Sequence, residues 1–339
     1  MSVYSPDDFR GNVVTSRIRL ARNLMGHPFK ITSPAESREI VKLVNRALVK
    51  CDTFNLYYTS NLRALELEAM KERNVISPNL IENKACGAAL VNQDETISVM
   101  ICEEDVLREQ GFSKGFHLSE VYKRLEKIDD ALCKNLDVAY DEKFGFLTAC
   151  PTNLGTGLRA SVMMFLPALT VSGKLGGLER EVNKLGLTIR GVYGEGSSAE
   201  GYMYQISNEI TLGHSEYQII NAVESAVIKI CEAEKAELNN VFGRHEITTL
   251  DEGSKAIGIL ENAVLLSYQD FLKYVSSIKI CSMCGLIKVD GIEALDELLF
   301  RVRPASLCYE YGKALNKLDR DLYRAKIVAQ KIKKITEGR

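Results

Sequence analysis

The chain has 339 residues, of which 46% are apolar and 26% charged, and its formal net charge is −2. This composition is that of a globular protein with one or two domains, and the slightly acidic balance argues against a dedicated nucleic-acid binder, which is usually basic. No stretch approaches the roughly 18 apolar residues of a membrane helix, and the start MSVYSPDDFRGN lacks a signal-peptide pattern, so we expect a cytoplasmic protein with no membrane or direct nucleic-acid contact.

The nine cysteines are odd in number and irregular in spacing, which is typical of free thiols in a reducing compartment. Cys281 and Cys284 have CxxC spacing. Without a second such pair or two nearby histidines, this spacing is only a weak sign of zinc, and we expect no metal held by the protein itself.

The first two thirds of the chain alternate strand-like and helical segments. A helix begins at Pro34, because Ser33 and Glu36 form a capping box and apolar residues then recur at helical spacing. Two apolar runs around a turn at 92–95 predict an antiparallel hairpin. Strands are predicted at residues 13–20, 54–60, 85–91, 96–102, 144–150, 186–192 and 202–208, and further helices at 62–73, 117–135 and 215–243.

From residue 255 to the end the pattern is amphipathic helix. Helical periodicity breaks near 243–254, where charge and glycine content rise, so we place one domain at residues 10–243 and a second at 254–339. The predicted fold class is α/β of the α+β kind, with a mostly antiparallel sheet flanked by helices and a helical C-terminal domain.

Five arginines are candidates for holding phosphate. The chain lacks both a Walker A motif and the motifs of protein kinases, so a nucleotide's phosphates would have to be held by other groups, and the arginine fork suits phosphate oxygens. Arg17 and Arg19 alternate along a predicted strand and therefore share a face. Arg108 follows an acidic cluster, Arg159 follows a glycine-containing loop, and Arg190 precedes a Gly/Ser-rich segment. Each alone is typical of a solvated arginine, but these positions favour a site.

Three glutamates and one cysteine are candidates for the chemistry. Glu103 and Glu104 close an apolar strand, and Glu195 lies within GEG. They are either exposed charges or carboxylates that grip a cation. A guanidinium has a pKa above about 12, so a carboxylate cannot deprotonate it beforehand. The carboxylates would instead position the guanidinium and take its proton as the N–P bond forms, which raises the rate by about 10²–10⁴-fold. Cys150 is either a small buried residue or a thiolate favoured by nearby cations.

Four ordered segments, TSRIRLARN, CEEDVLR, CPTNLGTGLRASV and RGVYGEGSSAEGYMYQISN, resemble motifs of the phosphagen (guanidino) kinase family. The resemblance implies a catalytic domain of the phosphagen-kinase and glutamine-synthetase-like type, which uses ATP with Mg²⁺ carried on the nucleotide. It implies that Glu104 and Glu195 hold and deprotonate the guanidinium and that Cys150 contacts it. The residues implied to bind ATP are Thr15, Ser16, Arg17, Ile18, Arg19, Asn74, Arg108, Arg159, Ala160, Ser161, Val162, Met163, Arg190, Gly191, Val192, Tyr193 and Gly194.

Three features favour the bacterial protein-arginine kinase branch of this family. The first arginine motif begins at residue 16, which leaves no room for the helical domain that encloses a free amino acid in other members. RASVM, YGEGS and QISN read as they do in that branch. The third feature is that Arg320, Asp321, Arg324 and Ala325 match its RDxxRA motif. In that branch the motif forms an accessory phosphoarginine-binding pocket. The same spacing is also typical of a solvated salt bridge on a helix.

The resemblance also implies partners: protein substrates with exposed arginines, a zinc-binding activator adaptor, a stress-response repressor and an AAA+ unfoldase–protease. It implies allosteric control and a homodimer formed through the helical tail. An apolar stripe there would pair two copies or pack on its own catalytic domain; it comprises Ile259, Leu260, Ala263, Val264 and Leu266.

Three residues depart from the family pattern. Cys102 and Val106 replace an Asn and a His beside Glu104, and Asn74 stands where the branch often has a His near the nucleotide. Support of the catalytic glutamate therefore differs; the carboxylates and all five arginines remain, so we expect activity, with a weakened enzyme as the alternative. Two alternative functions remain: a kinase of small guanidino compounds, and a non-catalytic phosphoarginine reader.

Overall fold

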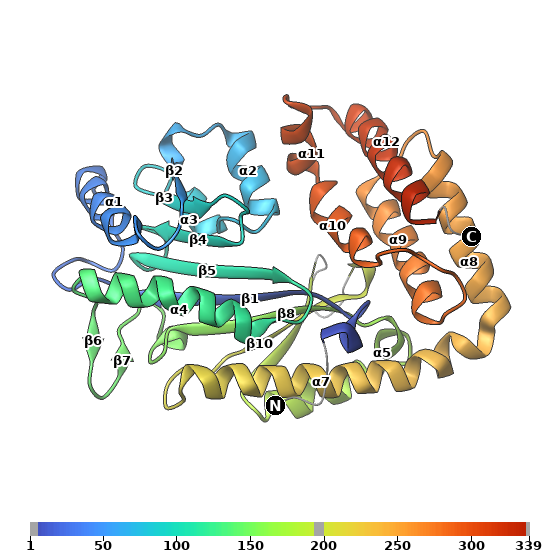
Figure 1. Cartoon of the computed structure of the whole chain (residues 1–339), viewed down its shortest axis with the longest axis horizontal. Helices are drawn as coiled ribbons and strands as arrows, with labels where there is room; N and C mark the ends of the chain where they lie inside the picture. The colour runs from blue at the N-terminus through green and yellow to red at the C-terminus, as the bar shows by residue number, and fades with distance from the viewer. Residues whose placement is uncertain (1–5, 193–199, 337–339) are drawn as a thin grey trace. The chain divides into compact units, whose positions relative to one another are not determined.

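The computed structural model, shown in Figure 1, describes residues 6–192 and 200–336. The chain divides into two compact units. We call Thr15–Val162 with Ser207–Glu224 the N-terminal unit, and Met1–Val14, Met163–Ile206 and Ser225–Arg339 the C-terminal unit. Among the residues that the structure describes, none of the helices combines the length and the apolar character that a membrane crossing requires.

A mostly antiparallel sheet has the strand order β2-β3-β4-β5-β1-β8-β10-β9; β2 to β5 and most of β1 and β8 belong to the N-terminal unit, whereas β9 and most of β10 belong to the C-terminal unit. The strands are β1 Val13–Arg22, β2 Phe54–Tyr58, β3 Ala88–Asn92, β4 Ile97–Ile101, β5 Leu107–Lys114, β8 Leu158–Phe165 and β10 Met203–Asn208, and a separate small sheet pairs β6 Tyr140–Asp141 with β7 Gly145–Phe146. The predicted hairpin is confirmed, since Ala88 lies opposite Ile101 in antiparallel pairing. β8 and β10 continue into the C-terminal unit, where β10 neighbours β9 Leu187–Gly191.

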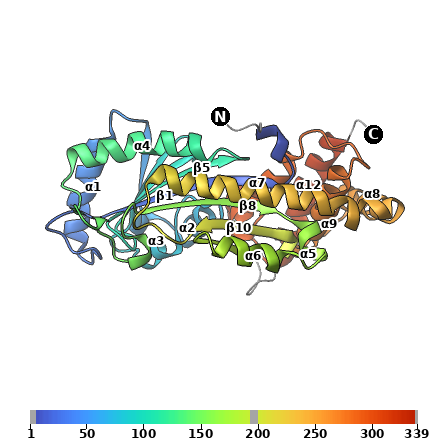
Figure 2. The same ribbon diagram turned by 90° about the horizontal axis from the view of Figure 1, so that it is seen from below.

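Helices cover the sheet of the N-terminal unit: α1 Pro34–Leu48, α2 Ala64–Glu72, α3 Pro78–Glu82 and α4 Leu118–Asn135. α4 packs against α1 and along β5 (Figure 2). The predicted apolar face of α1 is confirmed, because it is buried from Ile40 to Leu48. Ser33 caps this helix as predicted, whereas the Glu36 carboxylate pairs with His27 at 2.7 Å rather than closing the capping box. α2 and α3 are anchored on β3 and β4 by buried apolar residues, including Leu67.

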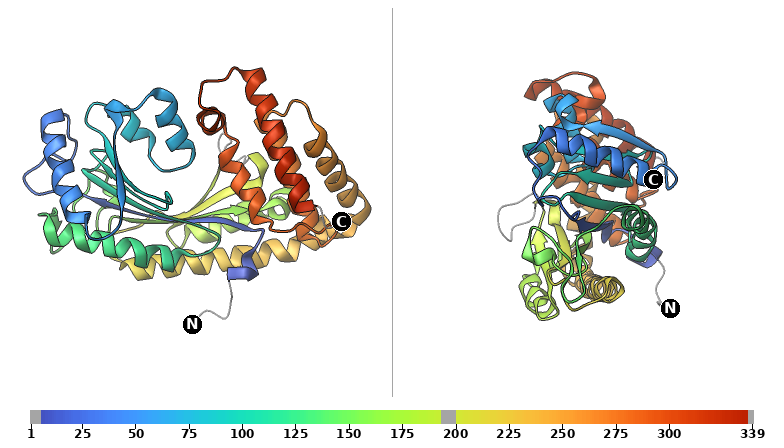
Figure 3. Two further views of the ribbon diagram at one scale, coloured as in Figure 1. Left: turned by 45° about the horizontal axis from the view of Figure 1, so that its top comes forward. Right: turned by 90° about the vertical axis from the view of Figure 1, so that its left-hand side faces the viewer.

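Helices dominate the C-terminal unit, and α8, α9 and α12 pack side by side there (Figure 3). Its core includes Phe271, Val275 and Val328, each at most 1% exposed. The helices are α5 Pro167–Val171, α6 Leu175–Asn183, α7 Glu216–Val241 (which begins in the N-terminal unit), α8 Glu246–Asn262, α9 Tyr268–Met283, α10 Glu293–Arg301, α11 Pro304–Tyr311 and α12 Lys317–Thr336. Short 3₁₀ helices cover Pro6–Phe9, Thr59–Asn61, Pro151–Asn153, Glu200–Tyr202 and Gly243–His245.

One predicted strand is largely wrong. Of residues 144–150, only Gly145–Phe146 forms a strand. Polar side chains bind the backbone that follows: Asn23 Nδ2 donates to the Leu147 carbonyl at 3.0 Å, and Asp105 Oδ1 accepts the Ala149 N–H at 2.6 Å. These side-chain bonds take the place of strand pairing, and they leave the segment free to turn into the loop that carries Cys150.

Two central strands are not predicted by the sequence pattern. β5 reads LREQGFSK, and its buried positions include Glu109 and Gln110, so apolar and polar residues do not alternate along it. β8 reads LRASVMMF and buries nearly every residue, which also hides the period of two that marks a strand.

Candidate functional site

Four of the five candidate arginines belong to neighbouring strands of the N-terminal unit. In the pairing of β1 with β5, Arg19 lies opposite Gln110, so Arg108 sits diagonally from Arg19 on the same face. Arg17 shares that face because it stands two residues before Arg19. Arg159 lies on β8, the strand on the other side of β1. The sheet therefore gathers side chains that are up to 142 positions apart in the sequence.

These guanidinium groups repel one another. Burial and the charges of Arg159 and Arg108 lower the pKa of Arg17 to about 10. Burial and the same neighbours, with Arg17 added, hold the pKa of Arg19 well below its ordinary value, although Glu103 opposes the change. Arg19 Nε is buried and has no hydrogen-bond partner among the described residues. Clustered positive charge with an open donor is complementary to a polyanion such as a triphosphate.

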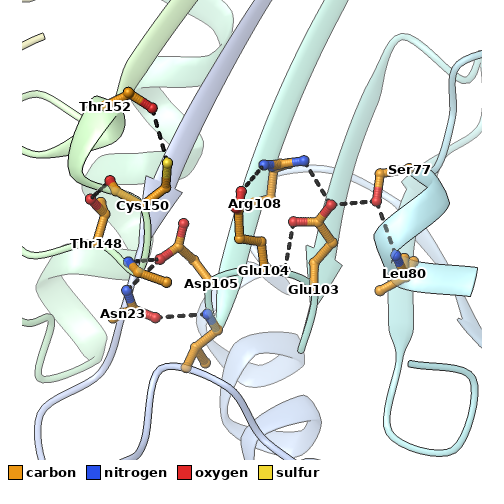
Figure 4. A network of polar contacts seen from close by, with 12 residues as sticks. Asn23, Ser77, Leu80, Glu103, Glu104, Asp105, Arg108, Thr148, Cys150 and Thr152 are labelled. Atoms are coloured by element: carbon orange, nitrogen blue, oxygen red, sulfur yellow. Dashed lines mark hydrogen bonds and ion pairs between the residues drawn. The ribbon is translucent and has the colours of Figure 1, made fainter. Parts of the chain in front are cut away.

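Arg108 forks between two glutamates (Figure 4). Its Nη1 lies 2.6 Å from Glu103 Oε1 and its Nη2 lies 2.9 Å from Glu104 Oε2. The Glu103 side chain is fully buried, whereas that of Glu104 is 35% exposed. Glu103 Oε2 also accepts the backbone N–H of Glu104 at 2.7 Å. Of the pair, Glu104 is therefore the carboxylate open to a substrate, and Glu103 holds the groups around it.

A cavity of about 220 Å³ lies beside this cluster. It is lined by Arg17, Arg19, Lys71, Asn74, Ile76, Ser77, Pro78, Asn79, Met100, Glu103, Arg108 and Gln110. Asn74 has φ +61°, a left-handed conformation that asparagine tolerates, and its carbonyl accepts a hydrogen bond from Gln110 at 2.5 Å. Asn74 is thus brought to the same cavity as the arginines.

The loop that carries Cys150 is tied to the carboxylates through Asp105, as Figure 4 shows. Asp105 Oδ1 accepts the N–H of Ala149 at 2.6 Å and Asn23 Nδ2 at 2.7 Å. Cys150 is half-buried, and its Sγ lies 3.0 Å from Thr152 Oγ1. Because Asp105 follows Glu104 directly and Ala149 precedes Cys150, one side chain fixes the spacing of the two predicted catalytic segments.

Arg22, at the end of β1, fastens the glycine-containing half of this loop. It binds both carboxylate oxygens of Asp129, at 2.9 and 2.7 Å, and its Nη1 donates to the Thr156 carbonyl at 2.9 Å. Gly157 has φ +63°, and a Cβ there would lie 2.6 Å from the Ala21 carbonyl oxygen and 2.7 Å from Arg22 Nη1. Glycine is required at this position by both its conformation and the close approach of Arg22.

The turn that presents Glu104 contains two of the three departures from the family pattern. Cys102 has φ +60°, a conformation that asparagine adopts with less strain than cysteine. Burial raises the pKa of its thiol to about 11. Val106 is fully buried; its carbonyl accepts the Cys102 N–H at 2.8 Å, and its own N–H donates to Asn23 at 2.8 Å. A backbone hydrogen bond and the Asn23 side chain therefore shape this turn.

The other residues predicted to bind ATP fall into three groups. Buried in the strands that carry the arginines are Thr15, Ser16, Ile18, Ala160, Ser161 and Val162. A second group belongs to the C-terminal unit: Met163, Arg190, Gly191 and Val192. Of these, Arg190 is exposed on β9. Tyr193, Gly194 and the predicted catalytic Glu195 lie outside the described residues.

The predicted phosphoarginine motif lies on α12. Arg324 is 1% exposed, so a solvated salt bridge is the wrong interpretation for this residue. Its Nη1 lies 2.6 Å from Asp321 Oδ1 and donates to the Leu266 carbonyl at 2.8 Å, while its Nε donates to the Val302 carbonyl at 2.9 Å. Arg320 is half-buried and donates to the Leu315 carbonyl at 3.2 Å; Ala325 is buried.

Sequence reasoning did not single out several residues that organise this site. Asn23, Asp105 and Arg22 lie within the quoted motifs, and their signal is a polar side chain inside an otherwise buried stretch. Gln110 is likewise a buried polar residue on β5, whereas Ser77 is half-buried and carries no such signal.

Comparison with known protein families gives two matches. Residues 37–237 match the family model "ATP:guanido phosphotransferase, C-terminal catalytic domain", and residues 246–339 match "Protein-arginine kinase McsB C-terminal domain". A protein-arginine kinase of Caldanaerobacter subterraneus subsp. tengcongensis is 38% identical over 328 residues, which cover 95% of this chain and 97% of that protein. A protein-arginine kinase of Clostridium kluyveri is 42% identical over 328 residues, with 95% of each chain covered.

Solved structures show the same fold. The duplicated taurocyamine kinase from Schistosoma mansoni with bound transition state analog components matches with a TM-score of 0.62 and 28% identity. The match covers 71% of this chain but only 36% of that duplicated protein. Lombricine kinase matches with a TM-score of 0.58 and 25% identity, over 69% of this chain and 68% of that one.

Proposed function

The chain belongs to the protein-arginine kinase family, which has the catalytic domain of the ATP:guanido phosphotransferases, and we propose that it phosphorylates arginine side chains in proteins through the site described above. The observation that carries this proposal is the gathering of arginines around a cavity beside Glu104, a partly exposed carboxylate. The arginines suit the phosphates of ATP, and the carboxylate suits the guanidinium of an acceptor.

The arginines hold the nucleotide in this proposal. Arg17, Arg19, Arg108 and Arg159, together with Arg190 of β9, bind the phosphate oxygens and offset the charge that develops on the transferred group. Within residues 6–192 and 200–336, no group of three or more His, Cys, Asp or Glu side chains is placed to hold a metal ion. We assign Mg²⁺ to the nucleotide, where it would offset the charge of the phosphates.

The carboxylates act on the acceptor. Glu104 and Glu195 hold the guanidinium in line with the γ-phosphorus, and Glu104 takes the proton that leaves the attacking nitrogen as the N–P bond forms and the bond to ADP breaks. Cys150 contacts the same guanidinium. The ion pair between Arg108 and Glu104 supports the assignment of Glu104 as the base. It holds Glu104 beside Arg108, which also lines the cavity proposed for the nucleotide.

We assign phosphoryl transfer to residues 10–243 and phosphoarginine binding to residues 254–339. The match of the C-terminal region to a protein-arginine kinase domain supports this division. Arg324 is already bound to two backbone carbonyls, so we propose that it maintains the shape of the pocket. We propose that Arg320 binds the phosphoryl group, with Asp321 and Ala325 beside the two arginines.

The wider setting is also a proposal. The substrates are proteins with exposed arginines, and the protein works in the cytoplasm as a homodimer. A zinc-binding adaptor activates it, a stress-response repressor is among its targets, and an AAA+ unfoldase–protease reads the product, so that marked proteins are degraded under stress.

A single incubation tests this function. The protein is mixed with ATP, Mg²⁺ and either unfolded casein or free arginine, and the intact masses are measured. We expect additions of about 80 Da on casein arginines. Phosphorylation of free arginine alone would instead indicate a small-molecule kinase, and binding of phosphoarginine without any transfer would indicate a reader.

A further inference from the structure

Ser77 makes two different hydrogen bonds with one hydroxyl group. It precedes Pro78 and caps α3, because its Oγ accepts the N–H of Leu80 at 3.1 Å. The same hydroxyl donates to Glu103 Oε1 at 2.5 Å. We propose that Ser77 is a positioning residue for phosphoryl transfer, which acts on Glu104 through Glu103 and Arg108. This inference rests on the catalytic role proposed above for Glu104.

The path from Ser77 to Glu104 consists of short, partly buried contacts (Figure 4). Glu103 Oε1 is shared by Ser77 Oγ at 2.5 Å and Arg108 Nη1 at 2.6 Å, and its other oxygen accepts the N–H of Glu104. Donors on both oxygens fix the rotation of this carboxylate. Its plane in turn sets the direction of the Arg108 fork, whose second nitrogen binds the Glu104 carboxylate.

Loss of the Ser77 hydroxyl removes one of the donors that fix this plane. The terminal torsion of a glutamate is broad, so the Glu103 carboxylate then rotates more freely, and the Arg108 fork follows it. Glu104 is 35% exposed and depends on Arg108 for its orientation. A displacement of about 1 Å in a reacting group costs up to about 100-fold in rate.

The segment around Ser77 is itself held firmly. Val75, Ile76 and Leu80 are at most 4% exposed and pack in the cluster that joins α2 and α3 to β3 and β4. Ser77 therefore connects a rigid apolar anchor to the carboxylates. It also lines the cavity together with Asn74, so the same segment borders both the nucleotide's proposed place and the base.

The chain offers a matched control in Ser33. Ser33 also precedes a proline and caps a helix, by accepting the Glu36 N–H at 3.4 Å, but it is an exposed residue on α1. Ser33→Ala therefore removes a helix cap alone, whereas Ser77→Ala removes a cap and the donor to Glu103. Because glycine caps a helix nearly as well as serine, Ser77→Gly and Ser33→Gly repeat the comparison with little loss of capping.

The experiment measures kcat, the KM for ATP and the thermal midpoint of the full chain, with casein as acceptor. We expect Ser77→Ala and Ser77→Gly to lower kcat by about 10-fold or more. The KM for ATP should change less than about 3-fold, because the other arginines assigned to the phosphates do not depend on Glu103. The Ser33 variants should retain kcat within about 2-fold, and Ser77→Thr, which keeps the hydroxyl, should restore most of it. In a Glu104→Gln background, Ser77→Ala should lower kcat by less than about 2-fold, because its route to the chemistry is already lost.

Two outcomes would overturn the inference. One is a kcat for Ser77→Ala and Ser77→Gly that matches their Ser33 counterparts; the other is the same fold-loss from Ser77→Ala with or without Glu104. The Glu104→Gln variant separates this failure from that of the proposed function. If it retains near-normal kcat, the base assignment itself is wrong; if it loses activity while the Ser77 variants do not, only the role of Ser77 is wrong.

Discussion

Replacing Arg17 with methionine should stabilise the folded protein while it abolishes phosphoryl transfer. Arg17 is charged at neutral pH in both the folded and the unfolded state, but the folded state disfavours that charge through burial and through Arg159 and Arg108. Methionine keeps much of the apolar stem and removes the repulsion. A gain in stability that accompanies a loss of activity is typical of a binding site built from like charges.

The size of the gain follows from the lowered pKa. The drop of the Arg17 pKa from its ordinary value to about 10 corresponds, at about 1.4 kcal/mol for each pKa unit, to about 3 kcal/mol against the charged form. The substitution also loses the bond from Arg17 Nε to Ser161 Oγ, and the side chain keeps some contact with water. We therefore expect a net gain of about 1–2 kcal/mol in the free energy of unfolding at pH 7.

The assay is urea unfolding of the full chain at pH 7 and low salt, with phosphoryl transfer to casein measured alongside. Arg22→Met is the control on the same strand. Asp129 raises the pKa of Arg22, so its charge is favoured in the fold, and breaking this buried pair should cost about 3–5 kcal/mol. If Arg17→Met destabilises the protein as Arg22→Met does, the account of a repulsive phosphate-binding cluster is wrong.

Two further substitutions have definite expected effects. Burial raises the pKa of Glu234 to about 7, so the folded state keeps a proton that the unfolded state releases, and stability should fall by up to about 3 kcal/mol as pH rises from 4.5 to about 7. Glu234→Gln should flatten the profile of urea midpoints against pH; an unchanged slope would contradict this. Gly157→Ala should lower the thermal midpoint and kcat together, because its Cβ would lie 2.6 Å from the Ala21 carbonyl oxygen. A midpoint equal to that of wild type would refute the need for glycine there.

Local patterns in the sequence predict much of the fold. The alternation of β1 places Arg17 and Arg19 on one face, and the spacing from Ile40 to Leu48 predicts the buried side of α1. These features depend on residues a few positions apart. The resemblance to guanidino kinase motifs adds the family, which the comparisons confirm.

The convergence of the arginines is not predictable in the same way. It depends on the pairing of β1 with β5 and on the place of β8. Neither partner strand shows an alternating pattern, because β5 buries Glu109 and Gln110 and β8 buries nearly every residue. The contact from Ser77 to Glu103 joins residues 26 positions apart through a fold of the chain that no local pattern encodes. Tertiary pairing decides both features.

In the proposed mechanism, Glu104 removes the proton from an arginine of the substrate while the arginine cluster holds ATP. The most direct measurement compares wild type with Glu104→Gln in the rate at which arginines of casein gain about 80 Da from ATP, with ATP affinity measured in parallel. We expect a loss of about 100-fold or more in rate, with ATP affinity nearly unchanged. A near-normal rate in Glu104→Gln, or phosphate found on hydroxyl side chains instead of arginine, would contradict it.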